Sequence, residues 1–276
     1  MDPADHAPRG GDLVFRHRLS TRLWHWFNAV ALLALLGSGL MIFNAHPRLY
    51  WGQYGANFDP AWLEIGATPE RGYLRVGALR VDTTGVLGRW TDPQGVVRLN
   101  AFPHWATIPS TYDLAGARHW HLFFAWALGL SGLLYWLRSL VNRHLRRDLL
   151  PRRDELRGGR LWRDVKEHAR LRFPTGEDAR GYNVLQKLSY LGVLFVLLPL
   201  ILLTGLAMSP GMNAAWPWLL DLFGGRQSAR SIHFILTLLL VGFTLVHVGL
   251  VLVTGPWNQL RGMVTGYYRL PRERDA

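Results

Sequence analysis

The chain has no cysteine among its 276 residues. This absence excludes disulfides, iron–sulfur ligation, thiolate chemistry and covalent c-type haem attachment. Aspartate and glutamate are missing as well from the interiors of four long apolar runs, which are Leu23–Phe43, Trp120–Val141, Val184–Met208 and Ser231–Val253. A metal held within these runs must therefore be bound by histidine or backbone, or be carried inside a cofactor.

Each of the four runs is long enough to cross the hydrocarbon core of a bilayer, which takes about 20 residues as a helix. Tryptophan and tyrosine gather near the ends of the runs, as they do at membrane interfaces. The first run is too long for the apolar part of a signal peptide and has no small-residue cleavage site after it. The sequence therefore predicts an all-α integral membrane protein, a single domain over 1–276 built as a four-transmembrane-helix bundle.

The formal net charge of +12 marks orientation in a membrane rather than nucleic-acid binding. The stretch Arg138–Arg180 holds 13 Arg or Lys against 7 Asp or Glu, and it lies between two apolar runs. Positive loops stay in the cytoplasm. We therefore expect a multi-pass protein of the bacterial inner membrane with both termini and the basic linker 142–183 cytoplasmic, and with the loop 44–118 in the periplasm.

The loop 44–118 is too long to be a simple connector. Within it, Val86–Leu99 predicts two short strands around the turn at residues 92–95. The loop is either a docking surface for an external partner or a lid over the membrane face, and the sequence does not choose between them. In the basic linker, Leu161–Leu171 predicts either an amphipathic helix lying on anionic lipid or a solvated connector.

Five of the 11 histidines lie at the apolar runs: His25, His119, His121, His233 and His247. His233 and His247 are 14 residues apart, which places them on nearly the same helix face and about 21 Å apart along the axis. With the predicted topology, His25 shares a depth with His247 near the cytoplasmic surface. His233 shares a depth near the outer surface with His121 or His119, both at the start of the second run. Two histidine pairs at two depths predict two bis-histidine b haems in the bundle core.

Haem suits these runs better than a bare metal ion does. A catalytic zinc or iron site takes three protein ligands, often including a carboxylate, whereas a haem needs only axial ligands and an apolar wall. Room for its ring can come from glycines in the helices, which equally serve ordinary helix packing. The candidates are Gly37, Gly39, Gly129, Gly132, Gly242 and Gly249.

The four runs with their flanks resemble the bacterial di-haem cytochrome b membrane subunits. The matching stretches are RLSTRLWHWFNAVALLALLGSGLMIFNAHPRLYWG, ARHWHLFFAWALGLSGLLYW, YNVLQKLSYLGVLFVLLPLILLTGLAMSP and SARSIHFILTLLLVGFTLVHVGLVLVTGPWNQLRGMVTGYY. This group includes the gamma subunit of formate dehydrogenase, the cytochrome b subunit of nickel–iron hydrogenase and, most similar of the three, the thiosulfate-reductase-type cytochrome b subunit. The resemblance implies axial ligands at His25, His121, His233 and His247.

The resemblance also bears on three further residues. His119 stands where the family commonly has an arginine, which favours His121 as the ligand and leaves His119 as a propionate neighbour or a surface residue. In the family, the segment Tyr182–Lys187 borders a quinone site beside the inner haem. Asn183 and Gln186 are therefore candidate quinone contacts, although the same residues also suit helix capping and an interfacial position.

We therefore expect a subunit that transfers electrons between the quinone pool and a periplasmic oxidoreductase, of the molybdopterin type if the thiosulfate-reductase likeness extends to the partner. Its cofactors would be two b haems, with quinone as an exchangeable substrate, and catalysis would belong to the partner. One alternative is a stand-alone quinone-linked cytochrome b that reacts with a small oxidant such as superoxide, against which the long loop argues. An alternative of another class is a haem-free membrane anchor or transporter whose histidines relay protons.

Overall fold

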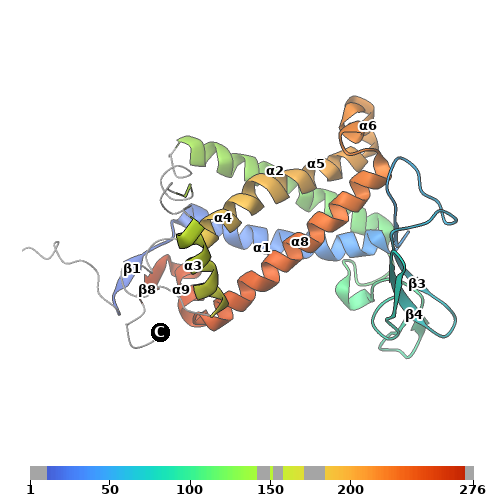
Figure 1. Cartoon of the computed structure of the whole chain (residues 1–276), viewed down its shortest axis with the longest axis horizontal. Coiled ribbons are helices and arrows are strands. Elements are labelled where there is room, and N and C mark those ends of the chain that lie inside the picture. Colours follow the sequence, from blue (N-terminus) through green and yellow to red (C-terminus); the bar gives the residue numbers. More distant parts are fainter. Residues whose placement is uncertain (1–10, 142–149, 152–157, 171–183, 271–276) are drawn as a thin grey trace, which may run out of the picture. The chain divides into compact units, whose positions relative to one another are not determined.

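The computed structural model describes residues 11–141, 150–151, 158–170 and 184–270. In this part of the chain, four helical spans are long and apolar enough to cross a membrane (Figure 1). They are α1 (Leu19–Phe43), α2 (Leu114–Val141), the continuous run of α4 (Val184–Gly192), η4 (Val193–Leu197) and α5 (Leu198–Met208), and α8 (Arg226–Val253). The four predicted spans are thus confirmed, and the chain is a multi-pass membrane protein.

The observed helices are longer than three of the four apolar runs. The third run agrees at both ends, whereas α1, α2 and α8 begin at Leu19, Leu114 and Arg226, several residues before the first apolar residue of each run. Hydropathy indicates how much of a segment suits lipid, but a helix continues beyond that point as long as its backbone groups find partners.

The third span contains a short π-helix, η4, between α4 and α5. Pro199 lies two residues after its end, within the first turn of α5. Proline has no N–H to donate and its ring collides with the carbonyl four residues earlier, here that of Phe195. A wider turn just before the proline relieves that collision while the helix continues.

The chain divides into two compact units, each built from segments that are distant in the sequence. The first unit comprises residues 1–27, 132–198 and 239–276, and the second comprises residues 28–131 and 199–238. The spans contribute segments to both units, and each unit is described separately below.

In the second unit, residues 44–113 connect α1 to α2 and form antiparallel sheets. One sheet has the order β2 (Arg48–Leu49), β3 (Leu63–Ala67), β4 (Gly72–Val76) and β5 (Leu79–Asp82). The hairpin of β6 (Trp90–Thr91) and β7 (Val97–Arg98) encloses the turn at residues 92–95, as the sequence predicted. The four-stranded sheet was not predicted, so the all-α description holds for the spans and is wrong for this segment.

The sheet packs on the ends of two spans of its own unit. Leu49, Leu63 and Ile65 from the sheet form one buried cluster with Phe43, the last residue of α1. Phe234 of α8 stacks on Phe43 with ring centroids 5.0 Å apart. The segment 44–113 is therefore fixed to the helices by apolar burial. Short elements complete this unit: η1 (His104–Ala106), α6 (Pro210–Ala215) and α7 (Trp218–Leu222).

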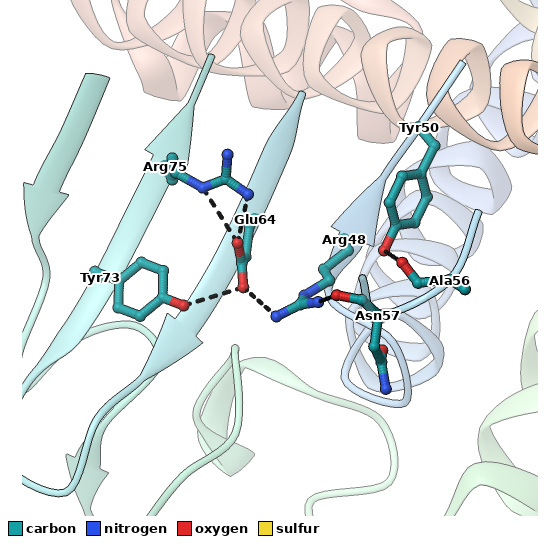
Figure 2. Close-up of polar contacts among 7 residues, drawn as sticks. All are labelled: Arg48, Tyr50, Ala56, Asn57, Glu64, Tyr73 and Arg75. Atoms are coloured by element: carbon teal, nitrogen blue, oxygen red, sulfur yellow. Dashed lines mark hydrogen bonds and ion pairs between the residues drawn. The ribbon is translucent and has the colours of Figure 1, made fainter. Parts of the chain in front are cut away.

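A buried carboxylate ties three strands of the sheet together (Figure 2). Glu64 of β3 is 5% exposed and lies opposite Arg48 of β2 and Arg75 of β4. Both guanidinium groups approach its oxygens to 2.6 Å, and the Tyr73 hydroxyl donates to it at 3.0 Å. Burial alone would raise the pKa of Glu64, but hydrogen bonds from Arg75 and Tyr73 and the charge of Arg48 hold it below its ordinary value.

In the first unit, β1 (Leu13–Phe15) pairs with β8 (Tyr267–Arg269), which follows α9 (Pro256–Thr265). Arg22 and Trp26 of α1 donate to backbone carbonyls at the end of α9. The helix predicted over Leu161–Leu171 is observed as α3 (Gly158–Ala169), and residue 171 lies outside the described residues. Trp162 on α3 is 60% exposed, as an interfacial side chain would be, and the lipid-surface role of the helix stays a prediction.

Candidate functional site

Four histidines of the spans form two pairs, one within each unit. In the first unit, His25 of α1 faces His247 of α8 with ring centroids 6.2 Å apart. In the second unit, His121 of α2 faces His233 of α8, also with centroids 6.2 Å apart. These are the pairs that shared depth predicted. Their role as ligands stays a prediction.

The separation within each pair fits one iron atom between two imidazoles. An imidazole nitrogen lies about 1.1 Å from its ring centroid and binds a metal at about 2.0 Å, so two axial rings on one iron have centroids about 6.2 Å apart. Rings joined by a direct hydrogen bond would lie closer together. Among the described residues no group of three or more His, Cys, Asp or Glu could hold a metal ion. The donor set therefore suits a haem, which brings its own equatorial ligands.

Buried hydroxyls contact both rings of the second pair. The Ser38 hydroxyl of α1 lies 3.0 Å from Nδ1 of His121, and the Thr204 hydroxyl of α5 lies 3.0 Å from Nδ1 of His233. Ser38 and Thr204 are both 0% exposed. A ring nitrogen bound in this way leaves Nε2 as the nitrogen that can reach a metal.

A glycine borders each ring of the second pair. A Cβ at Gly39 would lie 3.4 Å from Cε1 of His121, and a Cβ at Gly205 would lie 3.5 Å from Cε1 of His233. A side chain larger than that of alanine would thus displace the ring. Of the six glycines predicted to make room for a cofactor, all of them described, Gly39 is the one with a histidine ring among its nearest neighbours.

The first pair has a different surrounding. Nδ1 of His25 is buried without a hydrogen-bond partner in the described structure, and the ring of His247 stacks on Phe243 at 6.0 Å. Several basic side chains precede His25 in the chain. One of them, His17, has its pKa lowered to about 4, first by burial and then by the charges of Arg16, His25 and Arg22. Among the described residues, Nε of Arg16 and Nε of Arg22 are buried without a hydrogen-bond partner. This unit thus has free donors for an anionic group such as a haem propionate.

The structure says less about the other predicted site residues. His119 is exposed at the start of α2, while His121, half a turn later, faces His233. Gln186 is half-buried in the first turn of α4. Asn183 lies outside the described residues, so its predicted quinone contact stays a prediction.

Sequence reasoning missed Ser38, Thr204 and Gly205. A signal for them exists in the chain, because the first and third spans both contain a hydroxyl residue, a glycine and a leucine in succession: Ser38–Leu40 and Thr204–Leu206. A hydroxyl in an apolar helix normally bonds to its own helix backbone, so the motif alone does not indicate a second partner.

The chain is similar to known proteins along most of its length. A family model described as "Prokaryotic cytochrome b561" matches residues 16–266. A protein of Azospira oryzae named "Putative protein-methionine-sulfoxide reductase subunit YedZ1" is 26% identical over 83% of this chain and 86% of its own. The "Probable Ni/Fe-hydrogenase B-type cytochrome subunit" of Cupriavidus necator is 23% identical over 92% of this chain and 86% of its own.

Proposed function

The chain belongs to the prokaryotic cytochrome b561 family, and from that premise we propose that it is a di-haem subunit passing electrons between quinone and an oxidoreductase partner. Membership makes it a haem-containing membrane cytochrome b of electron transport. The number of haems, their ligands, the quinone and the partner belong to the proposal. The observation that supports it most is the equal spacing of the two histidine pairs, 6.2 Å in each unit.

His25 and His247 would ligate one haem, and His121 and His233 the other. A bound haem supplies reversible one-electron chemistry. The protein supplies the rest: four histidine nitrogens on three helices, apolar walls, and hydrogen bonds that orient the rings. In the first unit, Arg16 and Arg22 would bind the propionates, since their buried Nε atoms have no other hydrogen-bond partner in the described structure.

The proposed orientation rests on charge. The basic linker Arg138–Arg180 would lie in the cytoplasm, as would both termini, and the segment 44–113 would lie in the periplasm. The protein would then reside in the inner membrane of a bacterium. Cysteine residues introduced at Gln94 and at Lys166 test this: a membrane-impermeant maleimide should label position 94, and not position 166, in intact spheroplasts.

Quinone would react beside the haem of the first unit. Gln186 offers an amide that can hydrogen-bond a quinone carbonyl, and Asn183 would add a second. Purified protein is therefore expected to accept electrons from duroquinol or menadiol, seen as growth of the b-type alpha band. Gln186→Leu should raise the KM for quinol at unchanged haem content, while Gln94→Leu in the β6–β7 turn should change neither. A protein that dithionite reduces but neither quinol reduces would contradict the quinone link.

The partner would be a periplasmic oxidoreductase subunit, of the molybdopterin type if the likeness to thiosulfate reductase extends that far. The names of two relatives support an oxidoreductase partner, one a hydrogenase and the other a methionine-sulfoxide reductase. The segment 44–113 would receive it, since Tyr54, Phe58 and Trp105 are 85%, 101% and 84% exposed. Membranes solubilised in mild detergent should yield a complex containing molybdenum, and serine at these three positions should release it. Purification as a lone cytochrome under the same conditions would contradict the proposal.

A further inference from the structure

We infer that Ser38 and Thr204 are positioning residues that fix the tautomer of His121 and His233 and hold down the reduction potential of the haem between them. The inference rests on the proposed haem in the second unit. It assigns a role to two hydroxyls on α1 and α5, neither of which is a ligand itself.

Each hydroxyl lies within hydrogen-bond distance of carbonyls of its own helix, which can accept its proton. Ser38 Oγ donates to the Ala34 carbonyl at 2.6 Å, and Thr204 Oγ1 donates to the Leu200 carbonyl at 2.9 Å. A hydroxyl has one proton to donate and two lone pairs that accept. A hydroxyl that donates to its own helix can only accept from the histidine, which places the ring proton on the Nδ1 of His121 and of His233. Nε2 is then unprotonated in both rings and has its lone pair free for iron.

The same arrangement occurs twice, on different helices. In each case a fully buried hydroxyl binds Nδ1 at 3.0 Å, and the glycine next in sequence borders Cε1 of the same ring. A second backbone carbonyl lies beside each hydroxyl, that of Leu35 at 3.2 Å from Ser38 Oγ and that of Ile201 at 3.0 Å from Thr204 Oγ1. Each ring therefore has hydrogen-bond acceptors beside its Nδ1 edge and a glycine, with no side chain, next to its Cε1 edge.

The first unit lacks this support. Nδ1 of His25 is buried without a hydrogen-bond partner among the described residues. An N–H that donates to an acceptor pushes electron density onto the imidazole, which strengthens it as a ligand and stabilises the oxidised iron. The hydroxyls thus lower the potential of one haem and leave the other unchanged, so the two centres become unequal although both have two histidine ligands.

The test is a redox titration of hydroxyl-free variants in a background with a single haem. His247→Ala removes the haem of the first unit, so the remaining signal belongs to the second. Adding Ser38→Ala or Thr204→Val should raise its potential, and the pair together more than either alone. The expected change is threefold to tenfold in the reduction equilibrium constant, about 30–60 mV for one electron. The Leu35 and Ile201 carbonyls remain as acceptors, which keeps the shift moderate.

Conservative and matched variants separate tuning from general damage. Ser38→Thr and Thr204→Ser keep the hydroxyl and should return the potential to that of the parent. Ser131→Ala removes a hydroxyl that bonds only to its own helix, at the Leu128 carbonyl, and should leave the potential unchanged. Ser38→Ala could instead lose the haem, because the ring of His121 no longer holds its orientation. A haem content that returns to normal in Ser38→Thr would then also support the inference.

Two results would overturn the inference. One is an unchanged potential in the double variant at full occupancy of the second-unit haem, in which case the proposed di-haem function stands. The other is a haem loss that the hydroxyl-retaining variants do not restore. A wild-type protein with no haem at His121 and His233 is a different outcome, since it refutes the proposed function itself.

Discussion

Replacing Gly205 by valine should remove one of the two proposed haems. Gly205 on α5 faces the ring of His233, and a Cβ there would lie 3.5 Å from Cε1, an ordinary van der Waals contact. Valine adds two methyl groups about 1.5 Å beyond Cβ, and a helix allows it essentially one rotamer. A methyl group directed at the ring would approach it to about 2–2.5 Å, well inside the contact distance of about 3.5 Å.

The ring of His233 must then move by about 1 Å, which would break a bond of about 2.0 Å from His233 to a haem iron. Overpacking by the valine would lower the free energy of unfolding by about 1–3 kcal/mol, so the helices should stay folded. Pyridine haemochrome assay against protein concentration should give half the haem of the wild type. Gly205→Ala places only the Cβ at 3.5 Å and should keep full haem content. A fully loaded, normally reducible Gly205→Val protein would refute the placement of the haem at this ring.

Three further outcomes are expected. Glu64→Gln should destabilise the sheet by about 3 kcal/mol, because Arg48 and Arg75 lose their counter-charge, and faster hydrogen exchange over residues 44–113 measures this. The pKa of Glu64 is lowered in the folded state. The stability of the wild-type sheet should therefore be full above about pH 4.3 and should fall as pH drops through the folded pKa. Glu64→Gln should abolish this pH dependence. The free energy of unfolding of the first unit should fall as pH drops from about 6.5 to 4. In this range His17 is protonated in the unfolded chain but stays neutral in the folded protein, where its pKa is about 4. Thermal unfolding of His17→Phe should show a smaller pH dependence in that range.

Hydropathy and spacing were sufficient for the spans and for the pairing of the histidines. Four apolar runs without carboxylates can satisfy their backbone only as helices in lipid, and alternating direction then fixes which histidine ends share a depth. The exception is the choice between His119 and His121. Both lie at the start of the run, so spacing does not decide; the family resemblance favours His121, and the structure shows His121 facing His233.

The pairing of β2 with β3 in the four-stranded sheet could not be predicted from the sequence. The strand β2 has two residues, and its partner β3 begins 14 positions after it, so pairing depends on burial of Leu49 and Leu63 against Phe43 rather than on a local turn. The β6–β7 hairpin was predictable because an Asp-Pro-Gln-Gly turn closes it locally. Glu64 could not be identified as buried, since that depends on two arginines from neighbouring strands.

Ser38 and Thr204 illustrate the same limit within the spans. A hydroxyl in an apolar helix bonds to its own backbone in most cases, and both residues do so here. The additional contact to a histidine depends on how α1 faces α2 and α5 faces α8, which no spacing within one helix encodes. The repeated hydroxyl–glycine–leucine sequence becomes informative only once these neighbours are known.

The central claim is that each histidine pair holds one haem. The most direct measurement is the haem-to-protein ratio of the wild type, of His247→Ala and of His233→Ala, determined by pyridine haemochrome on purified, folded protein. We expect two haems per chain in the wild type and one in each variant, with the remaining haem at a different potential in the two variants. A wild type with one haem or none, or variants that keep the wild-type ratio, would contradict the claim.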